Sequence, residues 1–194
     1  MTAGGYDAFE DPYSYRRSDC LKNRLGFRDP EILQAFELGI STLRATEPLP
    51  TGRFGPTHYR RVHWHLFGDV NSWAGRYRTV RTAKVGNWFC FPEHIGRQMG
   101  LLFARLWTPL FQPGVDGDVF LTEAAASLGE HNAIHPFRDG NGRVQPSFLH
   151  LVALRTGHPL QFDRLAPEAF MPAVIQSFDG ELVALREELA ALRR

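Results

Sequence analysis

Nine consecutive residues, 135–143, with the sequence HPFRDGNGR, constrain the fold of this chain more than any other stretch. Two glycines flank Asn141, and glycine adopts backbone angles that other residues avoid, so the chain can turn sharply here. Apolar residues recur at helical spacing both before and after this stretch. The sequence therefore predicts two helices joined by a tight polar loop that carries a histidine, a carboxylate and an arginine.

Helix signals recur along the rest of the chain. Proline preceded by a capping residue or followed by glutamate is typical of a helix start. Such starts occur at Pro30, Pro56, Pro92 and Pro167, and helical spacing predicts further helices over 119–134, after Arg143 and over 181–194. We also expect a short helix at 18–25, ended by Gly26, and an interruption of the helix from Pro167 at Pro172 and at Gly180. The helix from Pro30 is expected to carry an apolar face of Ile32, Leu33, Phe36, Ile40 and Leu43.

One segment has β character. Residues 77–91 are rich in aromatic and β-branched side chains, with Gly86-Asn87 as a turn in the middle. This pattern predicts a β-hairpin. The alternative is an extended loop packed on the core.

The chain has the length and composition of one soluble globular domain. It has 194 residues, of which 43% are hydrophobic and 22% charged. We therefore predict a single mainly α domain over 1–194, a bundle of six to eight helices with a small β-hairpin. An irregular arm over about 1–17 is expected to be pinned by Tyr13 and Tyr15, and the C-terminal helix to span about 181–194.

Charge and hydrophobicity exclude several classes of protein. The net charge of +1 gives no indication of attraction to nucleic acid or to an anionic membrane. No apolar run has the length of a transmembrane helix, and the polar N-terminus does not resemble a signal peptide. The two cysteines, Cys20 and Cys90, lack metal-ligand spacing. We expect a cytoplasmic protein with reduced thiols.

The residue types in 135–143 suit phosphate chemistry. Backbone N–H groups of Gly140, Asn141 and Gly142 can converge into an anion-binding nest at the start of the following helix. Arg143 can donate two hydrogen bonds to phosphate oxygens, and Asp139 suits Mg²⁺. His135 could accept a proton from an incoming hydroxyl. Each feature alone is common turn chemistry, so the residues by themselves leave a structural role equally open.

A zinc site is the alternative reading of the histidines. His131 and His135 stand four residues apart, which on a helix places both rings on one face. No glutamate follows the first histidine and no third ligand is evident, so a packed or hydrogen-bonded His131 is the simpler interpretation.

The stretch matches the motif His-x-Phe-x-Asp/Glu-Gly-Asn-Gly-Arg-x-x-Arg of the Fic family, which the chain thus resembles. The segments DPYSYRRSDCLKNRLGF, HWHLFGDVNSWAGRYRTV and FCFPEHI are similar to the corresponding parts of short bacterial Fic toxins. The resemblance implies a Fic-fold helical bundle whose hairpin is a flap. It also implies transfer of AMP from ATP to a protein hydroxyl.

The resemblance also implies roles for individual residues. His135 would be the base, Phe137 the anchor of the loop, and Asp139 the ligand of Mg²⁺. Phosphate would be bound by Gly140, Asn141, Gly142 and Arg143, and the flap that pairs with the target would include Lys84, Val85, Gly86, Asn87 and Trp88. Glycine at 142 resembles the adenylyl-transferring branch of the family.

The chain departs from the motif at its last position. Pro146 stands where the family has a second arginine that contacts the γ-phosphate of ATP. Proline is expected to fit the first turn of the helix, but the missing cation leaves open a weakened transferase, another nucleotide donor, or a degenerate Fic fold that only binds.

The resemblance also implies partners. Related toxins modify subunits of type II topoisomerases, which are the first targets expected here, and a small antitoxin is expected to supply an inhibitory helix. Residues 177–182, SFDGEL, are only a poor match to the inhibitory motif that some family members carry in their own chain.

Overall fold

The protein is described by a computed structural model in which residues 11–84 and 86–193 are placed. The elements in chain order are α1 (Pro30–Thr46), α2 (Pro56–Phe67), β1 (Ala83–Lys84), β2 (Asn87–Trp88), α3 (Pro92–Arg105), η1 (Pro109–Phe111), α4 (Gly117–Ile134), α5 (Asn141–Thr156), η2 (Phe162–Arg164), α6 (Pro167–Gln176), η3 (Ser177–Asp179) and α7 (Val183–Ala191). The prediction of a mainly α fold with a small hairpin is confirmed.

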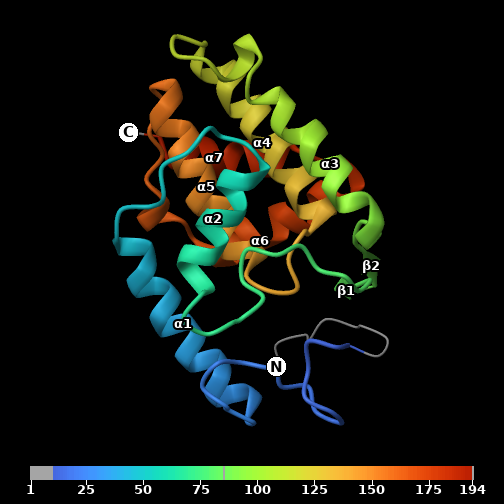
Figure 1. Ribbon diagram of the computed structural model, residues 1–194. Helices are drawn as coiled ribbons and strands as arrows, with labels where there is room; N and C mark the ends of the chain where they lie inside the picture. The colour runs from blue at the N-terminus through green and yellow to red at the C-terminus, as the bar shows by residue number, and fades with distance from the viewer. Residues whose placement is uncertain (1–10, 85, 194) are drawn as a thin grey trace.

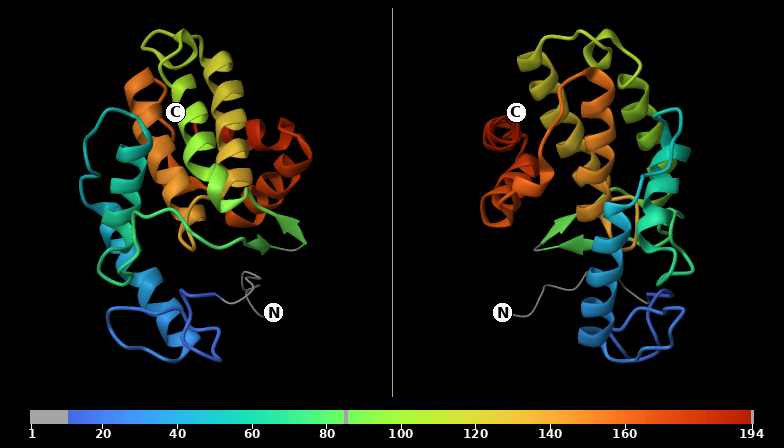
Figure 2. Two further views of the ribbon diagram at one scale, coloured as in Figure 1. Left: turned by 45° about the vertical axis from the view of Figure 1, so that its right-hand side comes forward. Right: turned by 90° about the vertical axis from the view of Figure 1, so that its left-hand side faces the viewer.

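Helix α4 lies at the centre of the bundle (Figure 1). It packs against α3, α5, α6 and α7, while α2 packs on α5 and α1 on α2. Figure 2 shows that α6 and α7 form a separate layer and that α1 extends away from the bundle toward the N-terminal arm. The loop between α4 and α5 therefore lies at the end of the bundle that faces the hairpin and α1.

The predicted helix starts are confirmed. Proline occupies the first turn of α1, α2, α3 and α6, where its missing N–H costs no hydrogen bond. The Asp29 carboxylate caps α1 by accepting from the N–H groups of Glu31 and Ile32, at 2.8 and 3.2 Å. Gly157, in the left-handed conformation with φ of 84°, ends α5.

The predicted helix at 18–25 is absent, and that prediction is wrong. Residues Ser14 and Leu21 form an isolated antiparallel bridge instead. The Asn23 side chain donates to the carbonyls of Leu21 and Phe27 and accepts from the Phe27 N–H. These local bonds satisfy the backbone without helical hydrogen bonds, which is why asparagine competes with helix formation.

The predicted apolar face of α1 is also wrong in large part. Ile32, Phe36 and Leu43 are between 42% and 57% exposed, whereas the buried positions are Leu33, Glu37 and Ser41. Helix α1 packs mainly on α2, so only a narrow stripe of it is covered. Its polar residues, Glu37 and Ser41, bind Arg143 at the start of α5.

The hairpin exists but is much shorter than the predicted 77–91. Its strands pair antiparallel, Ala83 with Trp88 and Lys84 with Asn87, around Gly86 at a φ of 81°. Outside the strands, the N–H groups of Arg78 and Cys90 donate to the carbonyls of Pro136 and Ala133. The legs of the hairpin are thus extended chain bound to the core, as the alternative interpretation held.

The helix from Pro167 is not interrupted at Pro172, which lies inside α6. The helix ends only at Gln176, and Gly180 in the left-handed conformation follows η3. At the N-terminus, Tyr13 pins the arm as expected. Its hydroxyl accepts from the Thr79 N–H at 3.1 Å, and its ring packs edge-on against Trp73. Residues 1–10 of the predicted arm and residue 194 of the predicted C-terminal helix lie outside the described residues.

Two hydrophobic clusters fill the interior. The main cluster joins α2 through α7, and a small one under the arm contains Cys20, Leu21, Leu33, Val70 and Trp73. In the part of the chain that the structure describes, no helix has both the length and the apolar character that a membrane span needs.

Replacing Asp29 with alanine is expected to destabilise the fold by about 1 kcal/mol, because two N–H groups at the start of α1 lose their acceptor. Chemical denaturation measures the change. The exposed Asp19 in the arm provides the control, because Asp19→Ala should leave the free energy of unfolding unchanged. Equal effects of the two substitutions would contradict the capping role.

Candidate active site

The loop between α4 and α5 is anchored by Phe137. This side chain is fully buried and stacks on the His63 ring with centroids 3.7 Å apart, while Tyr59 lies 5.5 Å away on α2. Burying a phenylalanine contributes about 1.5–3 kcal/mol. The predicted anchoring role of Phe137 fits this environment.

Asn141 closes the loop with its side chain. Its Oδ1 accepts from the Phe137 N–H at 3.0 Å, and its Nδ2 donates to the Phe137 carbonyl at 2.8 Å. The amide is fully buried. Any contribution of Asn141 to phosphate binding therefore comes from its backbone N–H at the start of α5.

His63 positions the acidic part of the loop, a role that the sequence analysis did not identify. Its Nδ1 accepts from the Gly75 N–H at 2.9 Å, so Nε2 carries the proton and donates to the Asp139 carbonyl at 2.9 Å. Burial lowers the pKa of His63 to about 3, which keeps the ring neutral.

His135 ends α4 in a left-handed conformation, with φ of 47°. Its ring stacks on Phe89, with centroids 3.8 Å apart and planes inclined by 11°. Nδ1 lies 3.3 Å from the Asn132 carbonyl, which can only accept, so the neutral ring carries its proton there and its lone pair on Nε2. Burial, assisted by the charges of Arg78 and Lys84, lowers the pKa of His135 to about 3.

Arg143 is held by helix α1. Its guanidinium donates to Glu37 at 2.5 Å and to the Ser41 hydroxyl at 2.9 Å, and it lies 4.5 Å from the centre of the Phe67 ring. The second Glu37 oxygen accepts from Asn71 at 2.6 Å. Burial and the nearby Asp139 carboxylate raise the pKa of Glu37 more than Arg143 lowers it. Glu37 lies outside the apolar face that the sequence predicted for this helix, and nothing in the sequence indicated its contact with Arg143.

Asp139 is half-buried at the tip of the loop, and its Oδ1 accepts from the Gly140 N–H at 2.6 Å. Among the described residues, no three His, Cys, Asp or Glu side chains are grouped closely enough to hold a metal ion. One carboxylate nevertheless fits Mg²⁺, which commonly takes one or two protein carboxylates and fills its other positions with phosphate oxygens and water.

A cavity of about 380 Å³ opens between the hairpin, the start of α5 and helix α6. This volume lies within the range of small-molecule sites. Basic and polar side chains line one side, among them Lys84, His135 and Arg143. The other side is apolar and consists of Leu165, Pro167, Phe170, Met171, Val174, Ile175 and Phe178. The arrangement suits an anion attached to a flat apolar ring.

The structure brings some of the predicted site residues together and separates others. His135, Gly142, Arg143, Lys84 and Asn87 line the cavity. Asp139 and Gly140 lie in the loop before α5, Asn141 begins that helix, and Gly86 lies in the hairpin turn. Trp88 is 56% exposed, with the Arg81 guanidinium 4.4 Å above its ring, and Val85 lies outside the described residues.

Pro146 also lines the cavity, but its expected place in the first turn is wrong. Helix α5 begins at Asn141 rather than near Arg143, so Pro146 lies within the helix in its second turn. There it cannot donate the N–H that the carbonyl of Gly142, four residues earlier, would otherwise accept.

Arg138 connects the loop to the N-terminal arm. Its Nε and Nη2 donate to the Asp11 carboxylate at 2.8 and 2.6 Å, and both side chains are at least nine-tenths buried. Position 138 is variable in the motif, so nothing in the sequence indicated the contact between Arg138 and Asp11. His131 is buried with its Nδ1 2.9 Å from the Ser127 carbonyl, as expected of a hydrogen-bonded core residue.

Gly140→Ala should destabilise the protein by about 2–4 kcal/mol, because φ is 80° and a Cβ atom would lie 2.5 Å from the Phe67 ring. Gly142 provides the matched control. No atom lies within 4 Å of a Cβ added there, so Gly142→Ala should leave stability unchanged or raise it by about 0.5–1 kcal/mol. Thermal and chemical unfolding of both variants test the pair. Similar losses would contradict the packing argument.

Comparison with known proteins agrees with this geometry. The model of the Fic/DOC family matches residues 53–153. The chain is 42% identical over 185 residues to "Probable protein adenylyltransferase y4lH" of Sinorhizobium fredii, covering 95% of this chain and 96% of that protein. It is 32% identical to "Protein adenylyltransferase VbhT" of Bartonella schoenbuchensis, covering 90% of this chain but only 37% of that protein.

Solved structures have the same fold. The N-terminal Fic domain of a VirB-translocated Bep effector protein from Bartonella quintana, solved with bound ADP, superimposes with a TM-score of 0.85. The two chains are 25% identical, and 94% of each is covered. The fold, the motif at residues 135–143 and these relatives together establish that the chain belongs to the Fic/DOC family.

Proposed function

We propose that this chain is a protein adenylyltransferase that transfers AMP from ATP to a hydroxyl group of a target protein. The main observation behind the proposal is that a neutral His135 ring and the Arg143 guanidinium line the same cavity at the start of α5. The names of the relatives support the reaction class, and the ADP bound to the Bartonella quintana domain supports a nucleotide as the ligand.

The proposed reaction uses His135 as general base. Its Nε2 lone pair accepts the proton of the target hydroxyl while the oxygen attacks the α-phosphorus of ATP. The bond breaks between the α-phosphorus and the oxygen that links it to the β-phosphorus, and pyrophosphate leaves with the electron pair of that bond. The Asn132 carbonyl, by accepting from Nδ1, fixes the tautomer that leaves the lone pair on Nε2.

Binding of the nucleotide should also raise the pKa of His135. The pKa of His135 at about 3 keeps its ring neutral but makes it a weak proton acceptor. A triphosphate in the cavity would bring negative charge close to Lys84 and Arg143, and negative charge raises the pKa of a nearby imidazole. His135 would thus become a stronger base only when ATP is bound.

The two sides of the cavity suit the two ends of ATP. The apolar side on α6 offers a surface for the adenine ring, and the N–H groups at the start of α5 favour the phosphates. Asp139 would hold Mg²⁺, which supplies charge neutralisation on the phosphates when bound. Arg143, held by Glu37 and Ser41, retains further N–H donors for phosphate oxygens.

The hairpin is the proposed docking point for the target. Its two-residue strands provide an edge to which an extended segment can add by backbone hydrogen bonds. Phe89 joins this edge to the base by its stack on His135. Subunits of type II topoisomerases are the first targets to test and a small antitoxin the first regulator, both by resemblance to short Fic toxins.

Labelled ATP tests the proposed reaction. Incubation of the purified protein with a bacterial lysate should transfer label from α-labelled ATP, but none from γ-labelled ATP. His135→Ala should reduce the rate by at least about 10²-fold, because the base is lost. Transfer from γ-labelled ATP would instead indicate a kinase, and no transfer from either would favour a protein that only binds.

Pro146→Arg is expected to lower the KM for ATP by about tenfold or more, because a charge-assisted hydrogen bond contributes roughly 1.5–3 kcal/mol. Pro146→Ala is the matched control, since it restores the N–H at this position without adding a charge. Initial rates at varied ATP concentration measure the effect. An unchanged rate and KM in Pro146→Arg would show that the missing cation does not limit activity.

A further inference from the structure

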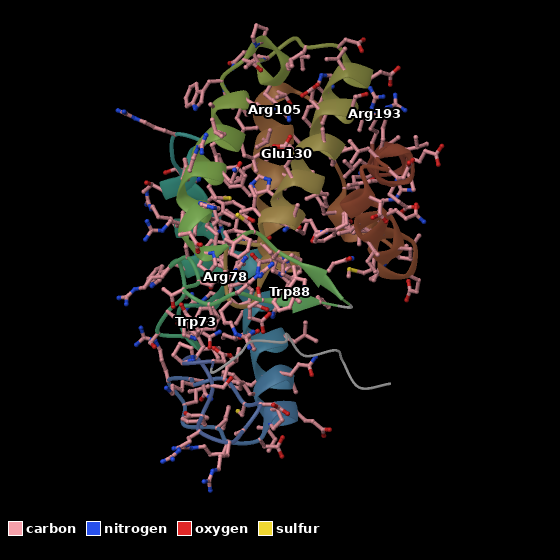
Figure 3. All side chains as sticks on the ribbon, turned by 90° about the vertical axis from the view of Figure 1, so that its right-hand side faces the viewer. Trp73, Arg78, Trp88, Arg105, Glu130 and Arg193 are labelled. Carbon is pink, nitrogen blue, oxygen red and sulfur yellow. The ribbon has the colours of Figure 1, made fainter. Side chains whose placement is uncertain are left out.

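Arg78 is a fully enclosed cation outside the motif. It lies in the extended segment between α2 and β1 and is 2% exposed. Figure 3 shows Arg78 beside the hairpin, on which Trp88 lies. Burying a guanidinium is costly unless its donors are used, so the partners of Arg78 indicate its purpose.

Two of these partners belong to the end of α4. Arg78 donates from Nε to the carbonyl of His135 at 2.8 Å and from Nη2 to the carbonyl of Ile134 at 3.2 Å. The last carbonyls of a helix have no partner within the helix, and they carry its negative dipole end. The guanidinium therefore caps α4 at the residue whose ring is the proposed base.

Two further partners flank the hairpin. Nη1 donates to the Val80 carbonyl at 2.6 Å, before β1, and Nη2 donates to the Cys90 carbonyl at 2.5 Å, after β2. Two backbone contacts support the same connection, from the Arg78 N–H to the Pro136 carbonyl and from the Cys90 N–H to the Ala133 carbonyl. One planar group thus spans both legs of the hairpin and the end of α4.

We propose that Arg78 is a positioning residue that sets the distance between the His135 ring and the hairpin that receives the target. The inference rests on the proposed function, since it assigns the hairpin to the target and His135 to the hydroxyl proton. A lysine cannot replace this contact, because a single ammonium lacks the planar fork that reaches carbonyls on both sides.

The position of Arg78 separates its effect from that of nucleotide binding. The described side chains that line the cavity do not include Arg78. The hairpin contributes only Lys84 and Asn87 to the wall of the cavity, whereas it is the proposed docking point of the target. A shift of the hairpin relative to His135 should therefore impair transfer to the target much more than nucleotide affinity. Misplacement of reacting groups by about 1 Å can cost on the order of 10²-fold in rate.

Arg78→Lys tests the inference, with Arg60→Lys as matched control. Arg60 lies on α2, donates to the Gly75 carbonyl at 2.7 Å and has its guanidinium 5.3 Å from the centre of the Tyr77 ring. Neither of these partners belongs to residues 135–143 or to the hairpin strands. Binding of a non-hydrolysable ATP analogue is measured by calorimetry. Transfer is measured as the initial rate of protein labelling from α-labelled ATP at several lysate concentrations, with each rate divided by the folded fraction of the variant.

Arg78→Lys should keep the affinity for the ATP analogue within about twofold of wild type and transfer label at least about tenfold more slowly, whereas Arg60→Lys should match wild type in both. A parallel loss of nucleotide affinity, or a rate restored by the correction for folding, would overturn the inference. If Arg78→Lys does not fold, Arg78→Gln, which keeps an amide donor without the charge, is held to the same criteria.

Hydrogen exchange distinguishes failure of this inference from failure of the proposed function. The Cys90 amide, bonded to the Ala133 carbonyl, reports on the connection without catalysis. Exchange in peptides covering 88–91 should be faster in Arg78→Lys and unchanged in α7. Unchanged exchange at 88–91 would overturn the positioning role even if wild type transfers label. If exchange at 88–91 is faster in Arg78→Lys but the wild type transfers no label, the structural role of Arg78 would be supported and the proposed transferase activity would be rejected.

Discussion

The stack of Phe137 on His63 is the contact on which the site depends. It joins the loop between α4 and α5 to helix α2, and it fixes the height of the loop relative to the core. His63 then holds the Asp139 carbonyl, and Asn141 closes the loop on the backbone of Phe137. The apolar contact of Phe137 thus fixes the position of the loop, and buried hydrogen bonds fix its conformation. The proposed function requires both, because the loop has to present polar groups to a ligand.

Two buried histidines in this region have the same lowered pKa, about 3, and serve different purposes. Both nitrogens of His63 are used by the backbone, so its ring is a structural bridge. The ring of His135 uses Nδ1 on the backbone and borders the cavity. The two histidines thus differ in whether the ring borders the cavity, and not in pKa, and this difference is the reason for proposing His135 rather than His63 as the base.

The charges around the cavity come from different parts of the chain. Arg143 is provided by α5 and is oriented by Glu37 and Ser41 of α1, while Lys84 comes from the hairpin. Pro146 adds no charge on the wall where the family motif has arginine. The end of the cavity that is proposed to bind phosphate therefore has fewer cations than the motif would provide. One of them, Arg143, is oriented by tertiary contacts with α1.

The sequence by itself determined the helical fold, most helix starts and the presence of a tight polar loop after residue 134. These features depend on local chemistry: capping by Asp29, proline in first turns, and glycine where φ is positive. Two predictions from local chemistry were wrong. The expected helix at 18–25 is absent because the Asn23 side chain bonds to the backbone, and α1 buries a partly polar stripe instead of the expected apolar face. Only the tertiary structure decided the partners of the loop. His63 and Asp139, Arg78 and His135, and Glu37 and Arg143 are 76, 57 and 106 residues apart in sequence. Side chains so distant meet only because the helices pack, and no spacing along the chain records that packing.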